Sequence, residues 1–230
     1  MREQLTLDLL DGPAAETVSG PTGHPPDEVE GVDEGVTLLR GWALAMESEL
    51  LSALRMVIRA APFRHLVTPG GQTMSVAMTN CGRYGWVSDR HGYRYTTQDP
   101  HSGLPWPAMP TTLRGLARDA AARGGFADYE PNACLVNRYT PGARLSLHQD
   151  KDERDFDAPI VSLSLGLPAI FLLGGLTRKE RARRIPLRHG DVIVWGGTAR
   201  LRYHGVLPIK EGHHPRLGPN RLNITFRRAR

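Results

Sequence analysis

The 230-residue sequence has few of the features that mark membrane or secreted proteins. Its only cysteines, Cys81 and Cys134, are too few for a disulfide framework, and no signal-like segment precedes them. The longest apolar stretch, residues 160–176, is interrupted by serine, glycine and proline and falls short of the roughly 20 residues of a membrane-spanning helix. No internal repeat is apparent. We therefore expect a cytoplasmic protein without membrane association, built around one sizeable core.

Charge is unevenly distributed along the chain. The net charge is +5, but residues 1–35 contain nine acidic residues against one arginine, a net of −8, so the remainder carries +13. An acidic segment rich in glycine and proline is typical of a disordered tail. A basic domain suits a polyanion such as nucleic acid, because neutralised phosphates release counterions. We expect a tail over residues 1–35 and one domain over residues 36–230; a basic surface that serves only solubility is the alternative.

Hydrophobic spacing predicts two helices followed by several short strands. Apolar residues recur at helical spacing over residues 43–60, and a second helical segment covers residues 112–123. Short segments rich in branched or aromatic residues, separated by glycine, proline and aspartate, predict strands at residues 35–39, 134–139, 159–165, 170–173, 191–195 and 222–226. This order indicates an α+β, mainly β fold: a double-stranded β-helix, or jelly roll, with covering N-terminal helices.

Residues 64–110, between the two expected helices, do not have the pattern of a core. Four aromatic residues are interleaved there with basic ones: Trp86, Tyr93, Tyr95 and Trp106 alternate with Arg83, Arg90, His91 and Arg94. Aromatic rings can stack on bases, and basic groups can hold the phosphates of a nucleic acid. We interpret this region as a nucleotide-recognition lid; an ordinary packed hairpin is the alternative.

Two histidines and a carboxylate form a possible metal site. His148 and Asp150 make a His-x-Asp pair whose side chains share one face of an extended strand, and His204 follows far downstream. Such a set holds a non-haem Fe(II) on one face and leaves the other face open, as oxygen chemistry requires. His213 and His214 are weaker alternatives to His204. The order of these residues points to an oxygenase.

The last expected strand indicates the cosubstrate. Its polar residues alternate with apolar ones and share one face: Arg221, Asn223, Thr225 and Arg227. Arginines inside a barrel need anions, and a guanidinium binds a carboxylate through two parallel hydrogen bonds. A dicarboxylate meets this need, and Asn137 and Tyr139 share a face from which they can bind it. An exposed basic edge strand is the alternative.

These residues resemble the Fe(II)/2-oxoglutarate dioxygenases and, among them, the bacterial AlkB family of oxidative DNA-dealkylation repair enzymes. The resemblance covers most of residues 62–227. It is carried by VTPGGQTMSVAMTNCG from Val67, PWPAMP from Pro105, NRYTPGARLSLHQDKDE from Asn137, SLGLPAIF from Ser164 and GDVIVWGG from Gly190. The acidic segment lies outside it.

The resemblance implies three groups of site residues. Fe(II) would be held by His148, Asp150 and His204. The cosubstrate 2-oxoglutarate would be bound by Asn137, Tyr139, Arg221, Asn223 and Arg227, with Arg221 nearer its distal carboxylate and Arg227 nearer its metal-bound end. The alkylated nucleotide would meet Trp86, Tyr93, Tyr95, Met78, Asp152, Arg178 and Trp195.

The implied reaction is oxidative demethylation of bases such as 1-methyladenine and 3-methylcytosine. It uses O2 and 2-oxoglutarate, and it releases formaldehyde, succinate and CO2. We expect a monomer acting on alkylated DNA, single-stranded in the first place, with double-stranded DNA and RNA left open. Two other functions remain: hydroxylation of a protein or small molecule, and nucleic-acid binding without catalysis around a structural metal. A closed structural site commonly has four protein ligands, whereas the sequence offers three.

Overall fold

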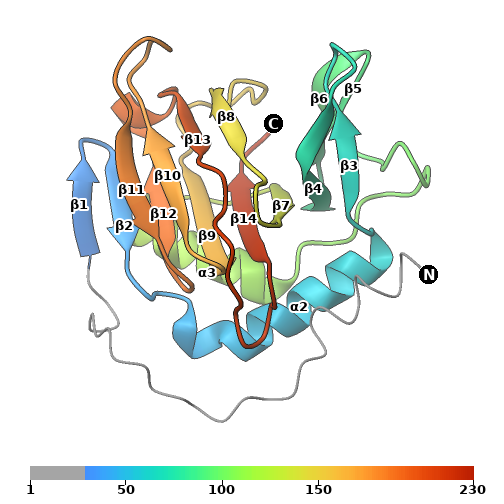
Figure 1. Ribbon diagram of the computed structural model, residues 1–230, viewed down its shortest axis with the longest axis horizontal. Helices are drawn as coiled ribbons and strands as arrows, with labels where there is room; N and C mark the ends of the chain where they lie inside the picture. Colours follow the sequence, from blue (N-terminus) through green and yellow to red (C-terminus); the bar gives the residue numbers. More distant parts are fainter. Residues whose placement is uncertain (1–28) are drawn as a thin grey trace.

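The expected strands assemble into two antiparallel sheets that face each other (Figure 1). The computed structural model describes residues 29–230; residues 1–28, and with them most of the expected tail, lie outside the described residues. The larger sheet contains, in spatial order, β1 (Val29–Asp33), β2 (Val36–Leu39), β12 (Val192–Trp195), β9 (Ile160–Gly166), β14 (Arg221–Arg227), β7 (Ala133–Tyr139), β4 (Thr73–Gly82) and β3 (Arg64–Val67). The smaller sheet contains β11 (Arg183–Leu187), β10 (Ala169–Leu173), β13 (His204–Val206) and β8 (Leu145–His148). The mainly β jelly-roll fold is confirmed.

Two helices cover the outer side of the larger sheet. They are α2 (Glu47–Ala60), preceded by the 3-10 turn η2 (Leu44–Met46), and α3 (Thr111–Arg123); a further 3-10 turn, η3, spans Gly197–Ala199. In Figure 1, α2 and α3 run beneath the strands. Both helices lie close to the residues at which the apolar spacing predicts them. Their apolar faces pack on the sheet, which is the reason for that spacing. Among residues 29–230, no helix has the length and apolar character of a membrane-spanning segment.

Alternate residues of the central strand β9 separate two cores. Val161, Leu163 and Leu165 face the helices and belong to the core beneath the larger sheet. Ser162 and Ser164 lie on the opposite side of the strand, toward the space between the sheets. A second apolar cluster fills the outer part of the space between the sheets. Polar side chains line the centre of this space.

Part of the segment expected as a disordered tail forms a strand. Residues Val29–Asp33 form β1, which pairs with β2. Two acidic residues of the expected tail form ion pairs with the domain: Arg40, ten residues along the chain, binds Glu30, and the distant Arg202 binds Asp33. Acidic composition alone therefore did not reveal that residues 29–33 are ordered.

The interpretation of residues 64–110 as a lid outside the core is wrong for its first part. Strand β4 lies between β3 and β7 in the larger sheet, and Val76, Ala77 and Cys81 are buried. What stands apart is the hairpin of β5 (Gly85–Asp89) and β6 (Gly92–Thr96), a separate two-stranded sheet. It carries the expected nucleotide-contacting aromatic residues.

The packing of α2 predicts a contrast between two positions on the same helix. Leu54 is fully buried, whereas Met56 is 61% exposed. We expect Leu54→Ala to lower the free energy of unfolding by about 2–5 kcal/mol, because it leaves a cavity. Met56→Ala, the control, should change it by less than about 0.5 kcal/mol. Urea unfolding followed by circular dichroism measures both; equal losses would contradict this packing.

Candidate functional site

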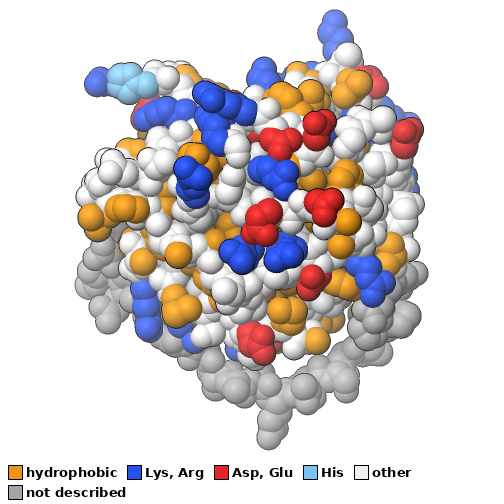
Figure 2. Space-filling model, turned by 180° about the vertical axis from the view of Figure 1, so that it is seen from behind, with side chains coloured by type: hydrophobic (Ala, Val, Ile, Leu, Met, Phe, Trp, Pro, Cys, Tyr) orange, Lys and Arg blue, Asp and Glu red, His pale blue; other side chains and the backbone are white. Residues whose placement is uncertain are grey.

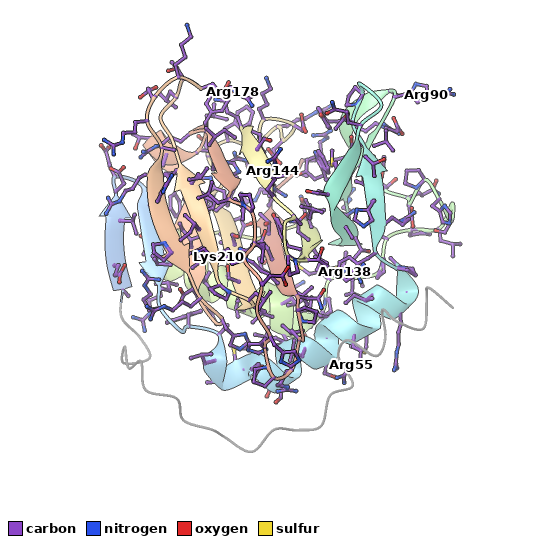
Figure 3. All side chains as sticks on the ribbon, viewed as in Figure 1. Arg55, Arg90, Arg138, Arg144, Arg178 and Lys210 are labelled. Atoms are coloured by element: carbon purple, nitrogen blue, oxygen red, sulfur yellow. The ribbon has the colours of Figure 1, made fainter. Side chains whose placement is uncertain are left out.

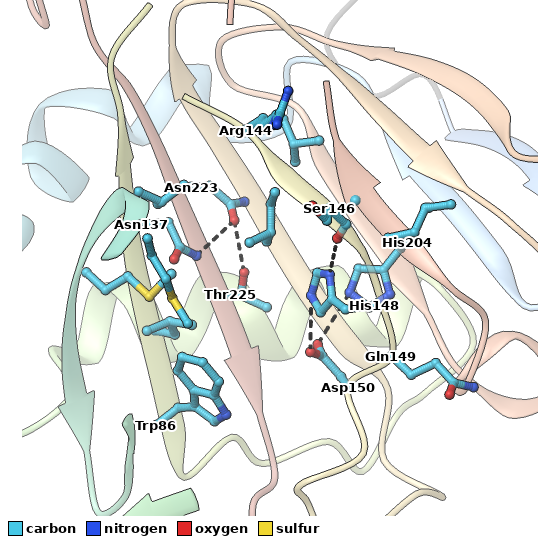
Figure 4. A pocket seen from close by; sticks show the side chains of 18 of the residues that line it. Trp86, Asn137, Arg144, Ser146, His148, Gln149, Asp150, His204, Asn223 and Thr225 are labelled. Atoms are coloured by element: carbon cyan, nitrogen blue, oxygen red, sulfur yellow. Dashed lines mark hydrogen bonds and ion pairs between the residues drawn. The ribbon is translucent and has the colours of Figure 1, made fainter. Parts of the chain in front are cut away.

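One pocket between the sheets gathers nearly all the expected site residues. It has a volume of about 670 Å³, and its lining includes residues of the hairpin β5–β6 and of both the larger and the smaller sheet. Every site residue expected from the sequence lines it except Tyr95. Figure 4 shows Trp86 on one side of this pocket and His148 and His204 on the other.

The two histidines of the expected triad are neighbours across two strands. In the pairing of β8 with β13, His148 lies directly opposite His204, and their ring centroids are 4.4 Å apart. Strand β8 ends at His148, so Asp150 follows the strand instead of continuing it. Its carboxylate still reaches both rings, with Oδ1 3.7 Å from His148 Nε2 and Oδ2 3.6 Å from His204 Nε2. One ligand atom from each of the three residues lies within 4.8 Å of the other two, as the ligands of one metal ion do.

Backbone carbonyls fix the tautomers of both rings. His148 Nδ1 lies 2.8 Å from the carbonyl oxygen of Ser146, and His204 Nδ1 lies 3.1 Å from that of Arg202. A carbonyl oxygen only accepts, so each Nδ1 carries the proton and donates it. Each Nε2 therefore keeps a lone pair directed at the common centre. This is the arrangement in which histidine ligates a metal.

Burial and neighbouring charges keep His148 neutral and Asp150 ionised, the forms in which these side chains bind a metal. Burial, followed by the neighbouring His204, lowers the pKa of His148 to about 4, so the ring is neutral at pH 7. Burial alone would raise the pKa of the Asp150 carboxyl, but Arg227 and His204 outweigh it and hold the pKa well below its ordinary value. Arg227 donates to Asp150 Oδ2 from Nε at 2.8 Å and from Nη2 at 2.6 Å.

A second group of polar residues surrounds a buried guanidinium at the other end of the pocket. Arg221 on β14 is 1% exposed and lies over the ring of Tyr139, its partner on β7. Its Nη2 donates to Ser164 Oγ at 2.9 Å. Within the described part of the chain, Arg221 Nε and Nη1 and the Tyr139 hydroxyl have no hydrogen-bond partner. Burial lowers the pKa of Arg221, so an anion at this point would relieve an unfavourable charge.

Asparagines and hydroxyls lie between Arg221 and Arg227 on the same face of β14 and of its neighbouring strands. Asn137 Nδ2 donates to Asn223 Oδ1 at 3.3 Å, and Thr225 donates to the same oxygen at 3.1 Å (Figure 4). Asn223 Nδ2 donates to Ser162 Oγ at 2.7 Å. Ser162 and Ser164 are site residues that were not expected from the sequence. Their signal was present, since they are two serines at a spacing of two in an otherwise apolar strand.

Comparison with known proteins identifies the family. The model of the 2OG-Fe(II) oxygenase superfamily matches residues 35–227. Over 195 residues, the chain is 55% identical to the alpha-ketoglutarate-dependent dioxygenase AlkB of Salmonella typhimurium and 54% identical to that of Escherichia coli, covering 85% of this chain and 90% of each relative. Among solved structures, that of OsALKBH1 superposes with a TM-score of 0.76 at 29% identity, covering 87% of this chain and 100% of the other. The chain belongs to the AlkB group of the 2OG-Fe(II) oxygenases.

An AlkB-group dioxygenase uses Fe(II), 2-oxoglutarate and O2, and the pocket fits these groups. The triad offers two imidazoles and one carboxylate, the donor set of non-haem Fe(II) oxygenases. The unpartnered donors of Arg221 and Tyr139 lie in the same pocket and suit the far carboxylate of a dicarboxylate. Arg227 lies beside Asp150, whereas Arg221 lies at the other end of the polar face of β14.

The hairpin of this AlkB-group protein presents its aromatic residues to the pocket in fixed positions. The Asn80 side chain binds both the N–H and the carbonyl of Trp86, which anchors that residue to β4. Trp86 Nε1 donates to Asp152 Oδ2 at 2.8 Å, and its ring stacks on Tyr93 at 5.5 Å with 12° between the planes. Tyr95 is not brought into the lining; its hydroxyl donates to Glu153 instead.

Three further residues expected from the sequence complete the lining. Met78 on β4 and Trp195 on β12 are buried there, and the Trp195 indole packs 5.1 Å from the His204 ring. Arg178, in the turn between β10 and β11, reaches the mouth. The structure therefore brings these residues of three separate elements to one site.

A second cluster of potential ligands has the wrong proton arrangement for a metal. Glu47, His189 and His214 lie close together, with the two rings stacked 4.3 Å apart. The Gly166 backbone N–H donates to His189 Nδ1 at 2.9 Å, so the neutral ring carries its proton on Nε2, the atom facing Glu47 Oε1 at 3.4 Å. Burial, followed by His214, lowers the pKa of His189 to about 4 and keeps it neutral. This cluster joins α2 to two turns.

The contrast between the two clusters predicts how substitutions affect metal binding. We expect wild-type protein to bind one Mn(II), a stand-in for Fe(II), per chain, and His204→Ala to lose this binding. His189→Gln should bind one Mn(II) with unchanged affinity, because its Nε2 offers no lone pair. Anaerobic isothermal titration calorimetry measures both variants. Loss of a bound ion in His189→Gln would contradict the assignment.

Proposed function

We propose that this dioxygenase removes methyl groups from cationic N-methylated bases, such as 1-methyladenine and 3-methylcytosine, in single-stranded DNA. The observation that carries the proposal is the pair formed by Trp86 and Asp152 at the pocket wall. A flat, positively charged base has two requirements, an aromatic surface and a nearby anion, and this pair offers both. The hydrogen bond from the indole keeps the carboxylate facing the pocket.

The proposed reaction assigns separate tasks to the two ends of the pocket. Iron and 2-oxoglutarate, when bound, supply an oxidant derived from O2 that inserts one oxygen atom into a C–H bond of the N-methyl group. The resulting N-hydroxymethyl base breaks its C–N bond to give formaldehyde and the repaired base, while 2-oxoglutarate becomes succinate and CO2. Trp86 and Asp152 hold the base, and the apolar surroundings of Met78 and Trp195 limit water.

Single-stranded DNA fits this pocket better than a duplex. The triad lies inside the pocket, so a base must leave its stack to reach it, at a cost of a few kcal/mol that is lowest for an unpaired base. Arg90, Arg144 and Arg178 lie in three separate loops (Figure 3), Arg144 and Arg178 line the pocket, and no ion pair to a described residue involves any of the three. They are free to bind the phosphates on either side of an extruded base.

The opposite face of the molecule is less suited to a polyanion. On the face behind the view of Figure 1, basic and acidic side chains are interspersed (Figure 2). Basic residues of α3 are also paired, since Arg114 and Arg118 both lie within 3.5 Å of the Glu130 carboxylate. This difference supports binding of the strand at the pocket mouth.

We further propose that the protein acts as a monomer in the cytoplasm. All three candidate iron ligands and the buried arginines of the pocket come from one chain, so the site needs no second subunit. Cys81 and Cys134 are free thiols in the core, as is usual in a reducing compartment.

The test of the proposed function is formaldehyde release from defined substrates. With Fe(II), 2-oxoglutarate and O2, we expect one formaldehyde per 1-methyladenine in a single-stranded DNA oligonucleotide, and none from unmethylated DNA or with His148→Ala. Parallel reactions with methylated duplex DNA and methylated RNA show, by the amount of formaldehyde released, which polymer is preferred. Succinate release that any methylated oligonucleotide leaves unchanged would contradict the proposal and favour a protein or small-molecule substrate. Absence of all 2-oxoglutarate turnover would favour a binding protein.

The charge of Asp152 predicts a difference between two lesions. Asp152→Asn keeps an oxygen that can accept from Trp86 but removes the negative charge. We expect kcat/KM for cationic 3-methylcytosine to fall about tenfold, the effect of roughly 1.4 kcal/mol, with a smaller change for neutral ethenoadenine. Asp119→Asn, on the exposed face of α3, is the control. An equal decrease for both lesions would refute a charge-based role.

A further inference from the structure

Glu153 is a buried carboxylate that has no role in the site described above. It is 5% exposed and lies three residues after Asp150. Its Oε1 accepts a hydrogen bond from the Tyr95 hydroxyl at 2.5 Å and lies 3.4 Å from Arg227 Nε. Its Oε2 accepts from Arg200 Nη2 at 3.2 Å. A carboxylate in the interior is costly unless it is paired, and this one is paired on both oxygens.

Both arginines held by Glu153 also hold Asp150, one at each end of that residue. Arg227 donates twice to the Asp150 carboxylate. Arg200, which is 2% exposed, donates from Nη1 to the Asp150 backbone carbonyl at 2.8 Å and from Nε to that of Ala158 at 3.0 Å. Asp150 follows the end of β8, so no strand pairing fixes it. Its position depends on these two guanidinium groups.

Tyr95 connects the same carboxylate to the hairpin. It lies on β6, in the two-stranded sheet that also carries Trp86 and Tyr93. Its hydroxyl reaches Glu153 beneath the pocket, while Trp86 reaches Asp152 at the pocket wall. The hairpin is therefore attached to residues 152 and 153, two and three positions after the candidate iron ligand Asp150.

We propose that Glu153 is a positioning residue that holds Arg227 and Arg200 against Asp150 and couples the hairpin, through Tyr95, to the metal site. Movement of the hairpin away from the pocket breaks the hydrogen bond to Glu153 and loosens the clamp on Asp150. Conversely, a metal that fixes Asp150 favours the closed hairpin, because coupling between two sites is reciprocal. The proposal concerns metal binding by the protein alone and does not depend on which nucleic acid is the substrate.

Two variants separate the positioning of Asp150 by the two arginines from the attachment of the hairpin through Tyr95. Glu153→Gln keeps the shape and an acceptor for Tyr95 but removes the charge that pairs with the two arginines. Tyr95→Phe removes only the hydroxyl. Tyr129→Phe is the matched control, since it removes a buried hydroxyl that has no hydrogen-bond partner among residues 29–230.

The experiment measures Mn(II) affinity by calorimetry and amide hydrogen exchange of residues 85–96 with and without Mn(II). We expect Glu153→Gln to bind Mn(II) about tenfold more weakly, as for other residues that support metal ligands. In wild type and Tyr129→Phe, Mn(II) should slow exchange in the hairpin several-fold. In Tyr95→Phe, Mn(II) should still bind, but exchange in the hairpin should no longer respond to it.

Either of two results would overturn the proposal: wild-type Mn(II) affinity in Glu153→Gln, or hairpin exchange that responds to Mn(II) in Tyr95→Phe as it does in wild type. Thermal unfolding checks that each variant is folded. If Glu153→Gln is not folded, the exchange response of Tyr95→Phe, which lacks a single oxygen atom, decides alone.

Discussion

The register of β14 between β7 and β9 is the constraint on which the pocket depends. Arg221 lies opposite Tyr139 and Asn223 opposite Asn137 in one pairing, and on the other side Asn223 lies opposite Ser164. A slip of one residue would turn the arginines toward the helices and the apolar residues into the pocket. The apolar core beneath the sheet prevents this, because Leu222, Ile224 and Phe226 are buried there. The packing that stabilises the fold thus also fixes the cosubstrate end of the site.

Proton placement distinguishes the two histidine clusters, although both contain two histidines and a carboxylate. Near the pocket, Nδ1 of His148 and Nδ1 of His204 each face a backbone carbonyl, so both Nε2 lone pairs are free. Beneath the sheet, His189 Nδ1 accepts from a backbone N–H, which commits its Nε2 to carrying a proton. The main chain therefore determines which cluster can hold a metal. Residue types and distances alone would not separate them.

Much of this site follows from periodicity in the sequence, and the exceptions have physical causes. The polar face of β14 and the His-x-Asp pair were visible because each lies within a few residues of the chain. Strand β4 was missed because its small residues and its glycine-rich neighbourhood hide the alternation of a buried strand. Strand β1 was not expected because its residues are acidic, and the arginine that binds Asp33 lies far away in sequence. Tyr95 was assigned to the substrate, yet its partner Glu153 lies in a different element.

Charge balance explains why so many ionised groups can share one interior. Asp150 and Glu153 are matched by Arg200 and Arg227, so this part of the site is close to neutral before any ligand binds. Fe(II) and the dianion 2-oxoglutarate bring opposite charges of equal size. Either one alone would leave a net charge away from water, whereas together they preserve the balance. The buried Arg221, which has no acidic partner among the described residues, adds a preference for the dianion at its end. Metal and cosubstrate should therefore stabilise each other's binding, and the two arginine–carboxylate pairs allow this by holding Asp150 in place before either arrives.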